Sequence, residues 1–218
     1  MSEPPTDLYD VRFGAEDAAA KDGVWREIVA YLARWIDPAA PVLDVGCDRG
    51  HFIRFAVGSE RWATDIRDVA AALPPDVHFV MGSGLELETL LPMGHFGTVF
   101  MSNYLEHLPS ADAVVDQLRI ARRLLRPGGR VVVLQPNIRL VGARYWDFID
   151  HKVALTENSL EEAANLAGLQ TEALIVRFLP YSTKGRLPAH PLLVRLFLRL
   201  SPAWRLLGKQ TLYVGTLR

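Results

Sequence analysis

The chain has almost no cysteine: Cys47 is the only one in 218 residues. One thiol forms no intrachain disulfide, so the sequence excludes a small secreted domain held together by disulfides. The chain also lacks a run of about 18 apolar residues and an opening basic stretch followed by an apolar one. We therefore expect a cytoplasmic protein without a membrane-spanning helix.

Acidic residues are missing from the last part of the chain. Between Ala173 and Arg218 there are eight Lys or Arg residues and no Asp or Glu. The net charge of the whole chain is only −1, so the acidic residues are concentrated before this part. This asymmetry favours contact between the C-terminal part and an anionic partner.

Three common ligand motifs are also absent. In a dinucleotide fingerprint that started at Gly46, Asp48 and His51 would replace the second and third glycines. No Gly-Lys-Ser or Gly-Lys-Thr occurs, which excludes a phosphate-binding P-loop. One cysteine and six scattered histidines match no zinc spacing, so the sequence predicts no metal site.

A glycine turn after a short apolar run is the main feature that is present. Val42 to Val45 is β-branched and apolar, which predicts a buried strand, and Gly46 and Gly50 then allow a tight turn. We expect a helical segment to follow, so that strand, turn and helix cradle a polar ligand. Asp65 ends the next predicted strand, at the spacing from the turn that places an acid on ribose hydroxyls.

The acidic residue in the turn indicates which class of ligand the turn can bind. Asp48 lies inside the turn, where its carboxylate would repel a pyrophosphate. A ligand with a ribose and an ammonium group, but without phosphate, fits this turn better.

Strand and helix patterns alternate along the chain. This alternation predicts a parallel sheet with helices on both faces. We expect a single domain over residues 1–218, with an N-terminal helical arm (1–36) and a helical insert (179–209) before the last strand. The predicted strands are 42–45, 61–65, 77–81, 96–102, 130–134, 172–178 and 210–217, and the predicted helices are 16–36, 85–91, 111–125, 161–167 and 190–207.

Four motifs in this order resemble the class I S-adenosylmethionine-dependent methyltransferases, over roughly residues 24–176. They are Val42–Gly50, Asp65, Asn103–Leu108 and Leu125–Arg130, the last followed by Val131–Val133. The resemblance, which is to bacterial enzymes of small molecules and glycans, implies a Rossmann-like, doubly wound sheet. This sheet would have seven mostly parallel strands and an antiparallel C-terminal edge strand. The implied cofactor is S-adenosyl-L-methionine.

The resemblance also implies which residues contact the cofactor. Asp48 departs from the family by replacing the middle glycine of the first motif, and Ser83 stands where many relatives carry the acid that meets the adenine amino group. We expect Cys47 to be a small buried residue rather than a nucleophile. The expected cofactor residues are Asp44, Gly46, Cys47, Asp48, Gly50, Asp65, Ile66, Gly82, Ser83, Ser102, Asn103 and Tyr104.

Methyl transfer needs a base only when the acceptor is a poor nucleophile. His151 is the first choice for this base and His107 the second, with Asp150 as a further candidate. The alternative for His107 is a packing or capping role, and the alternative for His151 is a structural role. Glu106 is either a cofactor neighbour or a solvated acid at the start of a helix.

Residues 178–207 form a basic, apolar and aromatic stretch. Such a stretch predicts contact with a membrane surface or with a lipid-linked or phosphate-bearing acceptor. The alternative is a lid or dimer-contact helix whose arginines are solvated, and the oligomeric state is left open. Nucleic acid is disfavoured as a partner, because the basic residues lie at one end with few aromatic residues among them.

Three functions are compatible with these observations. The leading one is a methyltransferase that acts on a small-molecule or glycan acceptor, including a lipid-linked sugar. The second is a non-catalytic S-adenosylmethionine-binding or regulatory protein of the same fold. The third is a nicotinamide-dependent oxidoreductase, which Asp48 and His51 oppose.

Overall fold

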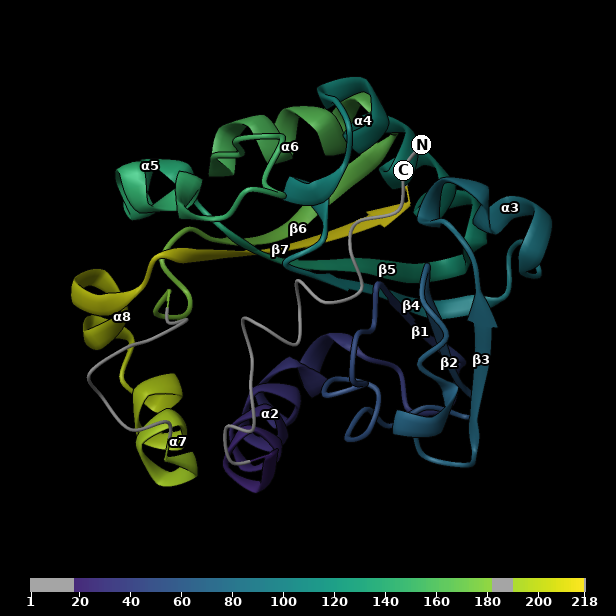
Figure 1. Ribbon diagram of the computed structural model, residues 1–218, viewed down its shortest axis with the longest axis horizontal. Coiled ribbons are helices and arrows are strands. Elements are labelled where there is room, and N and C mark those ends of the chain that lie inside the picture. The colour runs from purple at the N-terminus through teal and green to yellow at the C-terminus, as the bar shows by residue number, and fades with distance from the viewer. Residues whose placement is uncertain (1–17, 182–189, 218) are drawn as a thin grey trace.

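The protein folds around one seven-stranded sheet (Figure 1). The computed structural model describes residues 18–181 and 190–217. The predicted arm at Leu8–Phe13 and the part of the basic loop at 182–189 lie outside these residues. The strands are β1 (Val42–Val45), β2 (Arg61–Asp65), β3 (Val77–Met81), β4 (Phe96–Ser102), β5 (Leu125–Pro136), β6 (Leu169–Ile175) and β7 (Gln210–Leu217).

The strand order is β3-β2-β1-β4-β5-β7-β6. The first five strands pair in parallel, and the order reverses direction between β1 and β4, as in a doubly wound fold. β7 runs antiparallel between β5 and β6, so the antiparallel pairing lies at the C-terminal edge of the sheet. The predicted Rossmann-like fold is confirmed.

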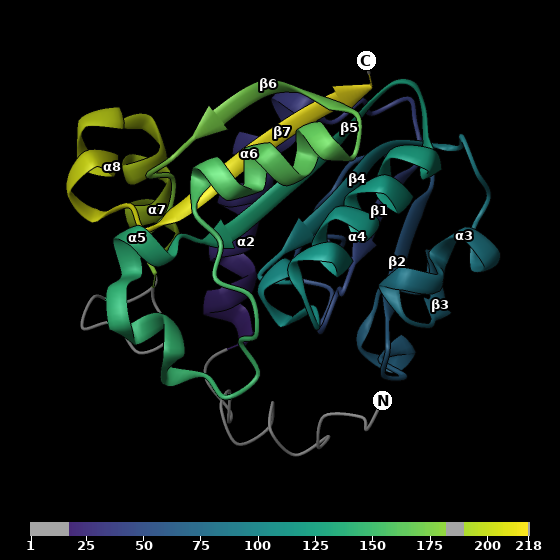
Figure 2. The same ribbon diagram turned by 90° about the horizontal axis from the view of Figure 1, so that it is seen from above.

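Helices cover both faces of the sheet. Figures 1 and 2 show α4 and α6 on one face and α2 and α7 on the other. The α-helices are α2 (Ala18–Leu32), α3 (Leu87–Leu90), α4 (Ala111–Leu124), α5 (Ile138–Val141), α6 (Glu157–Leu166), α7 (Pro191–Arg199) and α8 (Ser201–Leu207). Short 3₁₀ helices are η1 (Ala33–Trp35), η2 (Ala70–Ala72), η3 (Gly84–Glu86), η4 (Leu105–His107) and η5 (Gly142–Asp147).

Strand β5 shows why the sheet is apolar on both sides. Val131 and Val133 pack into the core under α4 and α6, whereas Val132 and Leu134 pack into the core with α2. Successive side chains of a strand point to opposite faces, so a strand covered on both sides must be apolar throughout. This pattern was predicted for β4 from its sequence, and β4 is buried from Phe96 to Met101.

Local capping sets the starts of the helices after β4 and β5. The Ser110 hydroxyl accepts a hydrogen bond from Ala113 N at 3.2 Å and begins α4. The Thr156 and Ser159 side chains form a capping box that begins α6 at Glu157, four residues before the predicted start.

Other predicted bounds were also wrong, since the strand predicted at 130–134 extends over Leu125–Pro136. The strand predicted at 172–178 lies at Leu169–Ile175, because Gly168, with φ of 82°, ends α6 early and lets the strand begin at once. The helix expected after the glycine turn is a series of turns over residues 48–55. Gly58 follows too soon for those turns to extend into a regular helix.

The predicted helix at 190–207, with its break near Ser201, is confirmed as α7 and α8. α7 packs beside α2, where Arg195 forms two hydrogen bonds with the Glu27 carboxylate at 2.8 and 2.7 Å. Arg195 is thus paired with α2, although its side chain stays half exposed. None of the described helices has the length and apolarity needed to cross a bilayer.

Candidate active site

The ends of the parallel strands bring the predicted site residues together. Gly46 N and Cys47 N donate to Thr64 O at 2.8 and 3.0 Å, which fixes the turn after β1 against β2. Gly82 N donates to Asp65 O at 2.9 Å and fixes the loop after β3 in the same way. In open α/β sheets, this carboxyl edge is where ligands bind.

The glycine turn has three residues in the left-handed region: Gly46 (φ 69°), Asp48 (φ 48°) and Gly50 (φ 71°). Asp tolerates this conformation better than most residues, so the turn survives the loss of the family's middle glycine. A Cβ atom at Gly46 would lie 2.5 Å from Cδ2 of Tyr104, so a side chain there would clash with the ring. Tyr104 therefore packs directly on the turn.

Asp65 lies at the end of β2, is 6% exposed and already has a full set of hydrogen bonds. Its Oδ2 accepts from Asp48 N at 3.0 Å and from Arg67 Nη2 at 3.2 Å. Its Oδ1 accepts from Arg67 N and from Arg67 Nε, both at 3.0 Å. A carboxylate has about four lone-pair sites, so Asp65 binds ribose hydroxyls only if Arg67 releases it.

Arg67 also bridges the turn, since its Nη2 donates to Asp48 Oδ1 at 2.9 Å. Sequence reasoning did not single out this residue. The available signal was a basic residue two positions after an acid that ends a strand, and that signal is common on protein surfaces.

The carboxyl groups of Asp44, Asp48 and Asp65 gather at the turn, and Arg67 pairs with the last two. Asp44 is 3% exposed, and burial raises its pKa to about 8, with the negative charges of Asp65 and Asp48 adding to the rise. The hydrogen bond with the backbone of Ile53 acts in the opposite direction. Carboxyl groups gathered in this way favour a cationic ligand and disfavour a pyrophosphate.

The remaining predicted cofactor residues differ in exposure. Cys47 is buried, and burial raises the pKa of its thiol, so it stays neutral and is not a nucleophile. Ile66 is half exposed beside Asp65. Ser83 accepts a hydrogen bond from Leu85 N at 3.3 Å and caps η3.

Ser102, Asn103 and Tyr104 follow the end of β4. Asn103 has φ of 46° and its side-chain amide donates to Ser102 Oγ at 3.3 Å. The Tyr104 hydroxyl donates to Gln117 Oε1 on α4 at 2.9 Å. Tyr104 is thus held between the turn and α4.

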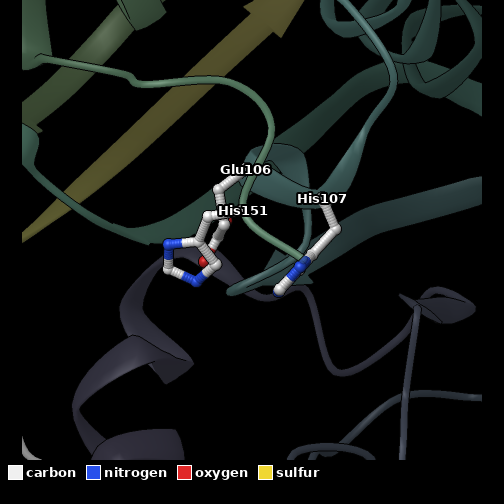
Figure 3. A group of neighbouring side chains, drawn as sticks. All are labelled: Glu106, His107 and His151. Atoms are coloured by element: carbon white, nitrogen blue, oxygen red, sulfur yellow. The ribbon is translucent and has the colours of Figure 1, made fainter. Parts of the chain in front are cut away.

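A second group of polar residues forms where η4 meets the loop after η5. Figure 3 shows Glu106 and His107 of η4 converging on His151 of the loop after η5. The backbone amides of Lys152 and Val153 donate to Glu106 O at 2.8 and 3.1 Å and join the two segments. The fold therefore brings together both predicted base candidates, which are 44 residues apart in the chain.

Glu106 is only 1% exposed, so its interpretation as a solvated acid was wrong. Burial raises its pKa to about 7; the positive charge that His107 can carry opposes this rise, and Asp150 adds to it. Neither carboxylate oxygen of Glu106 has a hydrogen-bond partner among the described residues. A buried polar group in this state indicates a missing proton or ligand.

Aromatic rings surround His151. The ring centroids of Tyr145, His107 and Phe148 lie 4.7, 5.0 and 5.1 Å from that of His151. The Tyr145 hydroxyl donates to Val153 O at 2.6 Å, which ties the ring to the loop. His107 Nδ1 lies 3.1 Å from Asp150 O, so Asp150 orients His107.

Asn137 follows the end of β5 and is part of a buried structural network, because its Nδ2 donates to Glu157 Oε2 at 2.6 Å and to Thr211 Oγ1 at 3.0 Å. Gln135 is fully buried at the end of β5, and neither polar atom of its side chain has a partner among the described residues.

Solved structures of similar fold are numerous, whereas no curated protein matches the chain. The complex between the Haloferax volcanii Trm112 methyltransferase activator and a candidate methyltransferase contains a similar chain, with 17% identity, a TM-score of 0.69 and 99% of each chain covered. A SAM-dependent methyltransferase from Archaeoglobus fulgidus has 16% identity and a TM-score of 0.64, with 97% of this chain and 99% of that one covered.

The cyclase SpnF has 16% identity and a TM-score of 0.60, with 88% of this chain and 81% of that one covered. At these identities the likeness shows the fold alone, and SpnF shows that the fold carries more than one chemistry. The sequence model described as "Methyltransferase domain" matches residues 18–174, which is most of the chain. The chain therefore belongs to the methyltransferase domain family.

Proposed function

We propose that this protein transfers a methyl group from S-adenosyl-L-methionine to a small-molecule or glycan acceptor in the cytoplasm. The observation that carries the proposal is the acidic glycine turn, where Asp44, Asp48 and Asp65 gather at the strand ends. S-adenosylmethionine is a cation with a ribose and no phosphate, so it fits this charge and this acid. The family match supports methyl transfer as the reaction.

The residues at the strand ends fit the parts of this cofactor. Asp65 would accept the ribose hydroxyls once Arg67 releases it, and the loop at Gly82 and Ser83 would border the adenine. Asp44 and the turn would receive the ammonium group. When bound, the cofactor supplies a methyl group on a positively charged sulfur, and the protein supplies position and exclusion of water.

The Glu106, His107 and His151 group is the proposed acceptor end of the site. His151 is the first candidate for the base that takes a proton from the acceptor, and His107 is the second. Tyr145 and Phe148 pack around His151 and limit its contact with water. A histidine in this position suits an acceptor hydroxyl or amine, because imidazole is the side chain that most often serves as a general base.

Two other functions remain in competition. SpnF, a [4+2]-cyclase of similar fold, is an example of this fold in a reaction other than methyl transfer. Asp65, whose hydrogen-bonding capacity Arg67 already uses, favours a regulatory protein with weak cofactor affinity. A nicotinamide dinucleotide is opposed by the acidic turn.

Calorimetry with S-adenosylmethionine, S-adenosylhomocysteine and NADH separates these functions. We expect binding of the first two ligands and none of NADH. Asp65→Ala should weaken binding at least ~10-fold, because hydrogen bonds to a charged group contribute on the order of 1.5–3 kcal/mol. Asp68→Ala, which changes an exposed acid three residues away, is the matched control. Binding of NADH alone, or of no ligand, contradicts the proposal.

Arg67→Met should tighten the binding of S-adenosylmethionine. The substitution keeps the length of the side chain but removes the guanidinium that competes with ribose for Asp65. Loss of an ion pair of about 1 kcal/mol predicts roughly fivefold higher affinity. The measurement is calorimetry beside wild type, with Arg119→Met, which changes an exposed arginine of α4, as control. Weaker binding would show that Arg67 contacts the cofactor instead.

His151→Gln should reduce methyl transfer without changing cofactor affinity. A general base typically contributes at least ~100-fold in rate, and glutamine cannot accept a proton at neutral pH. The measurement is incorporation of radiolabelled methyl into fractionated cell extract, followed by calorimetry of the same variant. Equal labelling by the variant and wild type would exclude His151 as the base.

The exposed side of α7 supports contact with a membrane surface, which would give access to a lipid-linked acceptor. Leu198 faces the core, whereas Leu192, Leu193 and Leu196 are more than half exposed. Arg199 is exposed on the same helix. An apolar face with basic residues is typical of helices that lie in an anionic interface.

Flotation with phosphatidylcholine vesicles, with and without phosphatidylglycerol, tests this contact. We expect binding that depends on the anionic lipid and that the double change Leu192→Glu and Leu196→Glu abolishes. Val57→Glu, which alters another exposed apolar residue, should leave it unchanged. Absence of wild-type protein from the floated fraction would rule out the membrane contact.

A further inference from the structure

We propose that Glu106, His107 and His151 bind a divalent transition-metal ion such as Zn²⁺. The ion site itself does not depend on the proposed function, whereas its use on the acceptor does. The spacing of histidines in the sequence gave no sign of it, because His151 comes from a different loop than Glu106 and His107. The fold creates the group.

The donor set is appropriate for such an ion. Two imidazoles and one carboxylate form the ligand set of several catalytic zinc sites and of non-haem iron sites, which keep a position open for water or substrate. One ligand atom from each of the three residues lies within 4.8 Å of the other two. Zinc bonds of about 2.0–2.1 Å place ligand atoms about 3.4 Å apart in a tetrahedral site. Side-chain rotations that move each ligand atom by roughly 1 Å would bring the three atoms to that separation.

Glu106 is the strongest single reason for the proposal. Its carboxylate is almost fully buried, no other residue that the structure describes donates a hydrogen bond to its two oxygens, and no Lys or Arg among those residues forms an ion pair with it. An ionised carboxylate in this position is unfavourable unless a cation or a set of donors compensates it. A divalent ion held by the neighbouring imidazoles supplies that compensation.

His107 has the orientation expected of a metal ligand. Its Nδ1 lies 3.1 Å from the backbone oxygen of Asp150 and 3.3 Å from the Asp150 carboxylate. A metal-binding histidine commonly donates its second ring N–H to such an oxygen, which fixes the ring and increases the basicity of the ligand nitrogen. With Nδ1 engaged in this way, Nε2 is the nitrogen that would bind the ion.

The backbone holds the ligands in place without the ion. The hydrogen bonds of Lys152 N and Val153 N to Glu106 O fix the His151 loop to η4, and Tyr145 anchors the same loop through Val153 O. Ligands on connected and anchored segments lose less conformational freedom on binding. Metal affinity therefore does not require the loop to fold around the ion.

The ion would change how the acceptor is activated. An acceptor hydroxyl bound at the open position would lose its proton to solvent, because a bound cation lowers the pKa of the hydroxyl. The oxygen lone pair then forms the bond to the methyl carbon, and the electrons of the carbon–sulfur bond stay on sulfur. In this arrangement His151 would hold the ion instead of acting as the base, so the two roles of His151 are alternatives that the zinc titration separates.

Zinc titration of the full-length protein tests the site. The protein is first dialysed against a chelator, and Zn²⁺ binding is then measured by calorimetry and Co²⁺ binding by visible absorption. Glu106→Gln and His151→Gln should each weaken the binding of Zn²⁺ and of Co²⁺ at least ~10-fold, since losing a ligand weakens metal binding more than losing a group that only orients a ligand. His95→Gln, a histidine outside the group, should leave both unchanged.

The possible results separate the proposal from its alternatives. If Glu106 is simply a protonated acid, wild type binds no Zn²⁺ and the proposal fails. It also fails if Zn²⁺ binds equally to wild type and both variants. Thermal unfolding and S-adenosylmethionine affinity, measured for each variant, show that it is folded. Zinc binding without cofactor binding would support the ion site and contradict the proposed function.

Discussion

The site depends on the hydrogen bonds that fix the glycine turn to β2. Gly46 N and Cys47 N donate to Thr64 O, and Asp48 N donates to the Asp65 carboxylate. These bonds require left-handed backbone at positions 46 and 48, which glycine adopts freely and aspartate tolerates. They hold the carboxyl groups of Asp44, Asp48 and Asp65 close together, although ionised carboxylates repel one another. Arg67 offsets that repulsion in the ligand-free protein, and a cationic ligand would offset it in the complex.

The parts of the fold that sequence predicted are those controlled by local pattern. β1, β2, β3, β4 and β7 have the predicted bounds, because each is a short apolar or alternating run between turn residues. The glycine turn and Asp65 were identified for the same reason, since both are fixed by spacing along the chain. The start of α6 and the bounds of β6 depend on a capping box and a left-handed glycine, which shift an element by a few residues without changing its pattern.

The parts that sequence did not predict depend on distant contacts. Glu106 looked like a solvated acid because it begins a short helical turn, but the His151 loop covers it through backbone hydrogen bonds. Arg67 looked like one surface charge among many. No periodicity reveals either residue, because their burial and pairing are decided by loops that meet only in the folded chain. The two features that mark the site most strongly are therefore visible only in the folded chain. Glu106 is a buried acid without a hydrogen-bond partner from another described residue, and the oxygens of Asp65 already accept four hydrogen bonds.

One short segment connects the two halves of the proposed site. Tyr104 packs on Gly46 of the cofactor turn, and two residues later Glu106 begins the group with His107 and His151. Asn103 turns the chain with a left-handed conformation just before them. Because η4 is a single rigid turn, the distance between cofactor turn and acceptor group is set by covalent geometry and by the Tyr104 hydrogen bond to α4. In-line displacement requires such a fixed separation, so a change that loosens η4 would affect methyl transfer even if both halves still bound their ligands.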